Sequence, residues 1–439
     1  MARFGAVALA VLFVLSRLPL LGAGFGADAD AWINAVGAVH MREAGRYLPT
    51  RIPGFPAYEA LLVLLIPLGP WATNGASVLA QAAAIAGFWR LALRIAPDRA
   101  AWATAAFAFG PPLWVDASQT MDYAFGLASM LGAYEALLAG RRAAAGALLG
   151  LATGFRPTLA LLLLPVGLML RARRESRAGG LAFAAAFGLV AGALFVPVLL
   201  AAPPGQMAGE FAFHAARQHV TFATAPRVVR VALAFAFGKL GTIVIVLGLL
   251  ATLVRRAAGT TGGAAAQVSG LAWGTILVLA AFYLVIPLDP AYLMPVVPIA
   301  LLLLARRFPA RWFAVAAIAI ISETLVTPLI DVQRLVPGRL FLERAVRREQ
   351  LASSQELLDL RPGTPTIYLV GRFQIHRMML RDPSLERTAA AWAAFRYPTG
   401  VALWSQDRRR GYAAFLEPAQ ADSLRAAGFT LEGNPTGVR

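Results

Sequence analysis

Two carboxylates and an arginine lie close together in the sequence, just after the first apolar segment. Asp28 and Asp30 occur in a Gly-Ala-Asp-Ala-Asp motif, and Arg51 lies in the proline-rich stretch Tyr47–Tyr58. A carboxylate can act as a general base, and a guanidinium can bind a phosphate through two parallel hydrogen bonds. Ionisable groups at a membrane surface are costly unless a substrate phosphate or a metal ion compensates them. The pattern therefore predicts a membrane enzyme.

Three later segments hold further candidates. Asp116 and Asp122 follow a Pro-Pro pair, and Asp289 and Tyr292 lie in another proline-rich loop. Arg156 belongs to a Gly-Phe-Arg-Pro motif, whose proline removes a backbone donor and disfavours helix in the residue before it. A helix break at membrane depth that contains an arginine usually lines a cavity. Arg156 is therefore a candidate for binding a phosphate.

Each candidate also has a purely structural interpretation. The aspartates could be helix caps or solvated turn residues. Arg51 could extend to lipid headgroups, and Arg156 could pair structurally with a carboxylate. Residues 1–29 could be a signal peptide, because Ala27-Asp-Ala29 is a small-x-small site after an apolar run. Arg17 interrupts that run, which favours a first helix that is retained.

The composition identifies the class of protein. Of the 439 residues, 59% are hydrophobic and only 14% are charged, so we expect a polytopic membrane protein. Basic residues exceed acidic ones by 40 − 23 = 17, but the arginines form short clusters between apolar runs. Membrane orientation explains such clusters better than nucleic-acid binding. The sequence contains no cysteine, which excludes disulfides and thiol nucleophiles, and no glycine-rich phosphate loop, which argues against a nucleotide-sugar donor.

The arginine clusters predict the topology. Arg3 precedes the first apolar run, so the N-terminus should be cytoplasmic. The clusters expected on the same side are Arg90, Arg94 and Arg99; Arg141 and Arg142; Arg171, Arg173, Arg174 and Arg177; Arg255 and Arg256; and Arg306, Arg307 and Arg311. With these constraints the chain should form about eleven transmembrane helices. Residues 31–46 and 57–69 should lie as helices at the outer interface, within a long first outer loop.

The sequence also predicts two domains. Residues 1–330 should form the all-α transmembrane domain, and residues 331–439 should form a small α/β domain outside the cytoplasm. In this second part we expect strands at 366–370 and 401–405 and a helix near 418–427. Its arginines should form a solvated basic face, although contact with anionic headgroups or a phosphorylated substrate is an alternative. They are Arg344, Arg347, Arg348, Arg408, Arg409 and Arg410.

Several motifs, taken in order, resemble those of the GT-C superfamily of polyprenyl-phosphate-sugar glycosyltransferases. They are the acidic pair, Y-L-P-T-R-I-P-G-F-P-A-Y-E from Tyr47, P-P-L-W-V-D-A-S-Q-T-M-D ending at Asp122, G-F-R-P around Arg156, and D-P-A-Y-L-M-P-V-V-P from Asp289. The likeness covers roughly residues 1–330. It is strongest to the bacterial branch that contains the aminoarabinose and protein mannosyl transferases. That branch usually has His/Glu-x-Arg-Tyr where this chain has Asp289-Pro-Ala-Tyr.

The resemblance implies a role for each candidate. The catalytic carboxylate would be Asp30 or Asp28, with Asp30 preferred. A second acid, Asp122 or Asp116, would orient the acceptor or share a divalent cation with the first. The residues implied for the donor phosphate are Arg51 and Arg156, supported by Tyr58, Glu59, Asp289 and Tyr292. No firm set of metal ligands can be assigned.

The implied protein is a multi-pass glycosyltransferase of the bacterial cytoplasmic (inner) membrane. It would move a sugar from a polyprenyl-phosphate donor to a lipid, glycan or protein acceptor of the cell envelope on the outer face, with inversion at the anomeric carbon. Its other partners would be membrane lipids and not nucleic acid. Two alternatives remain: a GT-C relative without activity, and a lipid or solute transporter. A transporter should show inverted repeats and polar groups near the middle of the membrane.

Overall fold

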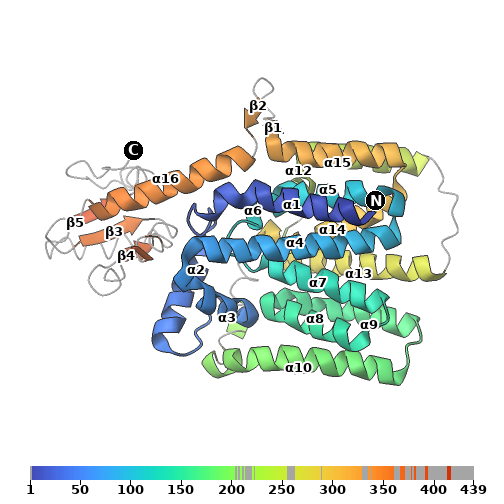
Figure 1. Ribbon diagram of the computed structural model, residues 1–439, viewed down its shortest axis with the longest axis horizontal. Coiled ribbons are helices and arrows are strands. Elements are labelled where there is room, and N and C mark those ends of the chain that lie inside the picture. Colours follow the sequence, from blue (N-terminus) through green and yellow to red (C-terminus); the bar gives the residue numbers. More distant parts are fainter. Residues whose placement is uncertain are drawn as a thin grey trace.

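The protein folds into a bundle of roughly aligned helices with a second region at one end (Figure 1). The computed structural model describes residues 2–202, 205, 208–209, 212, 220–221, 223–254, 263–287, 289–328, 335–337, 339–359, 366–370, 377, 380–381, 391–393 and 413–416. The helices of the bundle are α1 (Ala2–Leu21), α4 (Gly69–Ile95), α5 (Ala100–Phe109), α7 (Tyr123–Leu138), α8 (Arg142–Phe155), α9 (Leu163–Ala172), α10 (Arg177–Ala201), α12 (Ala225–Val254), α13 (Gly263–Val285), α14 (Val296–Arg307) and α15 (Ala310–Leu325).

Four helical segments are long and apolar enough to cross a membrane. They are Pro56–Ile95, Arg177–Ala201, Ala225–Ala251 and Val268–Val285. Shorter apolar helices accompany them at Val7–Leu21, Tyr123–Leu138, Arg142–Phe155 and Pro157–Ala172. The predicted all-α membrane bundle is therefore present. The count of eleven transmembrane helices stays a prediction, because many helices of the bundle are shorter than the roughly 20 residues that cross a hydrocarbon core.

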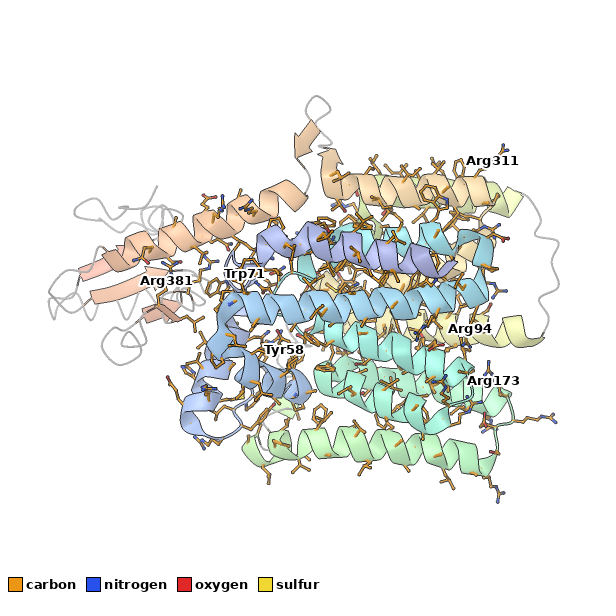
Figure 2. All side chains as sticks on the ribbon, viewed as in Figure 1. Tyr58, Trp71, Arg94, Arg173, Arg311 and Arg381 are labelled. Carbon is orange, nitrogen blue, oxygen red and sulfur yellow. The ribbon has the colours of Figure 1, made fainter. Side chains whose placement is uncertain are left out.

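The two ends of the bundle differ in character (Figure 2). Arg94, Arg173 and Arg311 come from three separate predicted clusters and lie together at one end, whereas Tyr58 and Trp71 lie toward the other. Such a gathering of arginines is the pattern on which the predicted orientation depends. The direction of the bundle in the cell remains a prediction.

Two short helices cover the end of the bundle opposite these arginines. They are α2 (Ala29–Ala44) and α3 (Pro56–Leu65), where interfacial helices were expected, and the 3-10 turn η1 (Ile66–Leu68) leads on into α4 (Figure 1). Gly45 ends α2 in the left-handed conformation, with φ of 61°. The loop 45–55 between these helices carries Arg51.

A proline pair breaks the helix that follows α4. Pro111 and Pro112 start the short helix α6 (Pro111–Asp116) immediately after α5, and neither can donate to a carbonyl of the preceding turn. Side chains from other helices supply donors instead. Arg17 Nη2 of α1 donates to Ala108 O at 3.1 Å, and Thr324 Oγ1 of α15 donates to Phe109 O at 2.7 Å. The break can therefore stay buried with these carbonyls satisfied.

Helix α8 carries the second break and packs closely on α10. Its glycines recur every fourth residue, and a Cβ on Gly146 would overlap the carbonyl oxygen of Phe183. Small residues at such spacing let two helix backbones approach each other. Helix α8 ends at Phe155, and the 3-10 turn η3 (Pro157–Leu162) continues into α9. Arg156 stands at this junction with extended backbone, φ −146° and ψ 101°, as the Gly-Phe-Arg-Pro motif predicts.

The chain after α15 returns to the end that carries α2. Strands β1 (Val326–Pro328) and β2 (Leu335–Pro337) pair antiparallel, and helix α16 (Arg339–Asp359) follows. Strands β3 (Thr366–Val370), β4 (Ala391–Ala393) and β5 (Ala413–Leu416) form a parallel sheet in the order β4-β3-β5. Strand β3 lies where a strand was predicted. The segments 401–405 and 418–427 and Arg408–Arg410 lie outside the described residues, so the division into two domains and the α/β domain remain predictions.

Candidate active site

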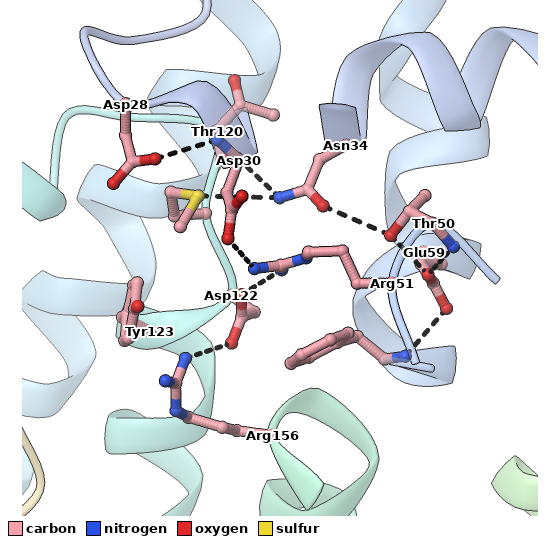
Figure 3. A network of polar contacts seen from close by, with 12 residues as sticks. Asp28, Asp30, Asn34, Thr50, Arg51, Glu59, Thr120, Asp122, Tyr123 and Arg156 are labelled. Carbon is pink, nitrogen blue, oxygen red and sulfur yellow. Dashed lines mark hydrogen bonds and ion pairs between the residues drawn. The ribbon is translucent and has the colours of Figure 1, made fainter. Parts of the chain in front are cut away.

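The first turn of α2 separates the roles of the two neighbouring aspartates. Asp28 is the N-cap of α2, and its Oδ1 accepts a hydrogen bond from Asp30 N at 2.8 Å. This satisfies one of the free N–H groups at the helix start. The Asp30 side chain is not used for capping and extends toward Arg51 (Figure 3). The structural interpretation is thus correct for Asp28 and incomplete for Asp30.

Four predicted residues form one continuous chain of ion pairs (Figure 3). Arg51 Nη1 lies 2.6 Å from Asp30 Oδ2, and Arg51 Nη2 lies 2.9 Å from Asp122 Oδ1. The other oxygen of Asp122 lies 2.8 Å from Arg156 Nη1. We call Asp30, Arg51, Asp122 and Arg156 the charge relay. Its two acids and two arginines balance one another, which offsets the cost of burying them.

The charge relay runs from an accessible end to a fully buried one. The side chain of Asp30 is 31% exposed and that of Arg51 15%, whereas Asp122 is 0% and Arg156 3% exposed. In the described part of the chain, Asp30 Oδ1 makes no hydrogen bond or ion pair. A carboxylate at the accessible end, held by one oxygen and free at the other, can accept a proton from a bound hydroxyl.

Aromatic rings surround the buried end. The guanidinium of Arg156 lies 3.9 Å from the ring centre of Tyr123 and 5.2 Å from that of Tyr292, which favours its positive charge. The Tyr123 hydroxyl donates to Asp289 Oδ2 at 3.0 Å, and Asp289 Oδ1 caps the turn η4 (Pro290–Leu293). Asp289 and Tyr292 therefore lie beside the relay without joining it. Tyr123 was not predicted, because neither its type nor its spacing in the sequence marks it.

Glu59 organises the loop that carries Arg51. It is fully buried, and it accepts from Thr50 N at 2.7 Å, Thr50 Oγ1 at 2.6 Å, Phe55 N at 2.9 Å and the Tyr47 hydroxyl. Arg51 in turn lies with its guanidinium 4.2 Å from the Phe55 ring centre. Glu59 makes no ion pair within the described residues, so its negative charge is held by neutral donors. Glu59 thus fixes the loop that carries Arg51, and its role in binding a donor phosphate stays a prediction.

The segment before Asp122 is bonded residue by residue to other parts of the fold. Thr120 N donates to Phe25 O at 2.8 Å, and its carbonyl accepts from Asn34 Nδ2 at 3.2 Å. The Gln119 side chain accepts from Asp28 N at 2.9 Å. These partners were missed because each lies far away in the sequence. Asp116 lies at the end of α6, accepts from Gln119 Nε2 at 3.4 Å, and is not a member of the charge relay.

Burial and neighbouring charge act together on the groups at the mouth of the site. Burial alone opposes the charge of Arg51, but Asp122 and Asp30 outweigh it and raise the pKa of Arg51 above its usual value. Burial raises the pKa of the Asp28 carboxyl. It also raises the pKa of the Tyr292 hydroxyl, which therefore stays protonated at neutral pH. The mouth of the site thus combines a charged arginine, held by two carboxylates, with a neutral tyrosine hydroxyl.

A divalent cation shared by Asp30 and Asp122 does not fit this arrangement. Arg51 lies between the two carboxylates and donates to one oxygen of each. In the part of the chain that the structure describes, no three His, Cys, Asp or Glu side chains are grouped so that they could hold a metal ion. The guanidinium of Arg51 therefore bridges the acids where the sequence alone left room for a metal.

Comparisons with known proteins identify the fold. No family model matches the sequence, and no curated protein sequence matches it. The solved structures that resemble this one include ArnT from Cupriavidus metallidurans bound to undecaprenyl phosphate, with a TM-score of 0.58 and 14% identity over 96% of this chain and 94% of that one. The same protein in its apo state has a TM-score of 0.57 and 15% identity over 98% and 96%. ArnT is a GT-C glycosyltransferase. The chain therefore has the GT-C fold, as the resemblance in its sequence predicted.

Proposed function

We propose that this protein is a membrane glycosyltransferase that uses a polyprenyl-phosphate-linked sugar. The observation that carries the proposal is the charge relay, which ends in an accessible carboxylate oxygen and contains two arginines beside it. Displacement of a lipid phosphate from an anomeric carbon needs a base for the attacking hydroxyl and positive charge for the leaving group. The relay offers both within one connected set of side chains.

In the proposed reaction Asp30 is the general base. As the acceptor oxygen attacks the anomeric carbon, its proton passes to Asp30 Oδ1, and the bond from that carbon to the phosphate oxygen breaks. The bonding electrons leave with the polyprenyl phosphate. Attack and departure on opposite faces of the sugar invert the anomeric configuration. Arg51 holds and orients Asp30 through Oδ2, so that Oδ1 faces the acceptor.

The two arginines are the proposed binding groups for the phosphate. Each has a buried Nε without a hydrogen-bond partner in the described residues, and the buried hydroxyl of Tyr58 has none either. A buried donor without an acceptor is costly, whereas an ionic acceptor such as a phosphate oxygen makes a strong bond with it. The ArnT structure bound to undecaprenyl phosphate supports this class of donor. Asp122 would hold both arginines in position between turnovers.

The proposed orientation places the charge relay at the outer face of a bacterial cytoplasmic membrane. The arginine-rich end would then be cytoplasmic, together with the N-terminus, and the region after α15 would be outside. The acceptor would be a lipid, glycan or protein of the cell envelope. A polyprenyl-linked donor fits this side, because it needs no nucleotide there. Labelling engineered cysteines near Arg94 and near Thr50 with an impermeant reagent would test the orientation, since the natural sequence has no cysteine.

The test of the proposed function is a transfer assay with purified protein in detergent. Wild type and Asp30→Asn are incubated with radiolabelled polyprenyl-phosphate sugars and a lipid extract, and the label is followed into acceptors. We expect transfer by the wild type and a loss of about 10²- to 10⁴-fold in the variant, as for a positioned base. Donor binding should survive, because Asp30→Asn leaves both arginines in place. Binding without transfer by the wild type would instead indicate an inactive relative or a transporter.

A further inference from the structure

Helix α16 inserts a buried arginine beside Ser118, four residues before the central acid of the charge relay. Arg347 Nη1 donates to Ser118 O at 2.9 Å and lies 3.4 Å from Leu20 O, and its Nη2 donates to Ser118 Oγ at 3.1 Å. Its side chain is fully buried, whereas its neighbour Arg348 on the same helix is exposed. The prediction of a solvated basic face is therefore wrong for Arg347. The sequence does not reveal this, because 229 residues separate Arg347 from Ser118.

The burial of Arg347 is compensated on every side. Glu343, one turn earlier in α16, accepts from Arg347 Nε at 2.7 Å. Leu20 lies in the last turn of α1, and its carbonyl also accepts from Ala23 N at 3.2 Å. One guanidinium thus joins α16, the end of α1 and the segment that starts at Ser118. A buried guanidinium with this many partners fixes the positions of the groups that it binds, because a buried polar group left without a partner is costly.

Ser118 starts the segment that ends in the central acid of the charge relay. Residues 117–122 are all buried, and Asp122 holds Arg51 and Arg156 at once. The segment has no regular secondary structure between α6 and α7, so its conformation depends on its side-chain and loop hydrogen bonds. A displacement at Ser118 would therefore be passed along the chain to the Asp122 carboxylate.

A second arginine of the C-terminal region contacts the helix that carries Asp30. The guanidinium of Arg377 lies 5.4 Å from the ring centre of Trp32, and its Nη1 donates to Gln350 O of α16 at 3.2 Å. Trp32 follows Asp30 by two residues, and its Nε1 donates to Gly26 O at 2.7 Å. The same region therefore contacts both segments that supply carboxylates to the relay.

We propose that Arg347 is a positioning residue, through which the C-terminal region fixes the segment Ser118–Asp122 and thereby the charge relay. The geometric part of this proposal stands without the proposed function, and only its effect on donor binding and transfer rests on that function. Removal of the Arg347 guanidinium should loosen the Ser118–Asp122 segment and move Asp122 away from its two arginines. Misplacement by about 1 Å can lower turnover by roughly 100-fold.

Hydrogen exchange tests the geometric part on the full chain in detergent. Arg347→Gln is compared with Arg348→Gln, which removes the same charge from an exposed position of the same helix. We expect amides of residues 118–122 to exchange about tenfold faster or more in Arg347→Gln and at the wild-type rate in Arg348→Gln. Unchanged exchange in Arg347→Gln would overturn the proposal. If that variant fails to fold, Arg347→Lys takes its place, because lysine keeps the charge but not the forked contact. We then expect faster exchange of the same amides, at smaller amplitude. Exchange at the wild-type rate in Arg347→Lys would overturn the proposal as well.

A double-mutant cycle tests the route to the site. Binding of undecaprenyl phosphate is measured for wild type, Arg347→Gln, Asp122→Asn and the double variant, at a temperature at which all four are folded. If Arg347 acts through Asp122, Arg347→Gln should weaken binding in the wild type about tenfold and add little in the Asp122→Asn background. An equal loss in both backgrounds would show that Arg347 acts elsewhere. Failure of the wild type to bind or transfer would refute the proposed function alone, because the exchange result would still decide the role of Arg347.

Discussion

The buried arginines of the charge relay and the buried Arg17 of α1 differ in the partners that compensate their charge. In the charge relay, Arg51 and Arg156 are neutralised by Asp30 and Asp122. Arg17 in α1 is just as buried, but it makes no ion pair within the described residues. Its guanidinium lies 3.3 Å from the ring centre of Trp114 and 3.8 Å from that of Phe13, and it donates to Ser16 Oγ at 2.6 Å and Ala108 O at 3.1 Å.

The difference separates an arginine used for structure from arginines available for a ligand. The charge of Arg17 is spread over aromatic faces and carbonyl oxygens, and one of those carbonyls lost its helical donor to the proline pair. Its Nε, like those of Arg51 and Arg156, has no hydrogen-bond partner in the described residues, but two rings lie against its guanidinium. The relay contains carboxylates that can exchange partners, and it has an accessible end at Asp30. Burial alone is therefore a poor guide to function, and the type of partner is a better one.

Asp122→Asn should have the largest effect, because it removes the carboxylate that both relay arginines share and leaves the buried Arg156 with aromatic contacts but no ion pair. Breaking a buried pair in this way typically costs about 3–5 kcal/mol. We expect a large drop in the melting temperature in detergent and loss of transfer. Asp98→Asn, at an exposed position of the turn after α4, is the matched control. Equal melting temperatures for the two variants would contradict the importance of the bridge.

Arg156→Ala should come next and should act mainly on the donor. A hydrogen bond between charged groups contributes about 1.5–3 kcal/mol, so undecaprenyl phosphate should bind roughly 10- to 100-fold more weakly. Arg156→Lys keeps a positive charge but has no forked donor, and we expect it to restore part of the affinity. Titration of both variants with undecaprenyl phosphate provides the measurement. Wild-type affinity in Arg156→Ala would assign the phosphate to another group.

Arg17→Met should destabilise the protein and leave transfer unchanged at a permissive temperature. Methionine can pack among the same rings, but the Ala108 carbonyl loses its donor, at a cost of about 1–3 kcal/mol. Thr324→Val removes the neighbouring donor to Phe109 O and should act in the same direction. Thermal unfolding and initial transfer rates are measured side by side. Reduced transfer by fully folded Arg17→Met would place Arg17 in the mechanism and end the contrast between the two groups.

Asp28→Asn should have the smallest effect, although it lies two residues from Asp30. Asparagine caps a helix as well as aspartate does. Since burial raises the pKa of Asp28, ionisation of this carboxyl costs stability in the fold, and its replacement by a neutral amide should not lower the melting temperature. We expect transfer within about twofold of wild type. A loss as large as that of Asp30→Asn would show that both acids, or Asp28 itself, act in the reaction.

The sequence predicted the charged members of the site but not what holds them. Asp30, Arg51, Asp122 and Arg156 could be identified because charged residues beside apolar helices are rare and costly. The ion pairs between them could not be predicted, because the paired residues are 21, 71 and 34 positions apart in the sequence. Tyr123, Asn34 and Thr120 went unnoticed, because an uncharged side chain in a helix or a connecting segment has no distinctive pattern.

The fold was predictable to the level of the bundle and its interfacial helices. Apolar runs and prolines mark α1, α3, α10 and the break at Arg156 well. Helix α16 was missed, because its sequence is polar around most of its surface and was assigned to a soluble tail. The contact of its Arg347 with Ser118 joins residues that are 229 positions apart, and local composition does not reveal such a contact.

The proline break beside Arg17 also bears on how the chain enters the membrane during synthesis. Arg17 is made 91 residues before Ala108, the carbonyl that it will bind. Until α5 and α6 emerge, the Arg17 guanidinium near the end of the first helix has only Phe13 and Ser16 of that helix as partners. We therefore expect α1 to reach its final position only when the segment around the double proline meets it.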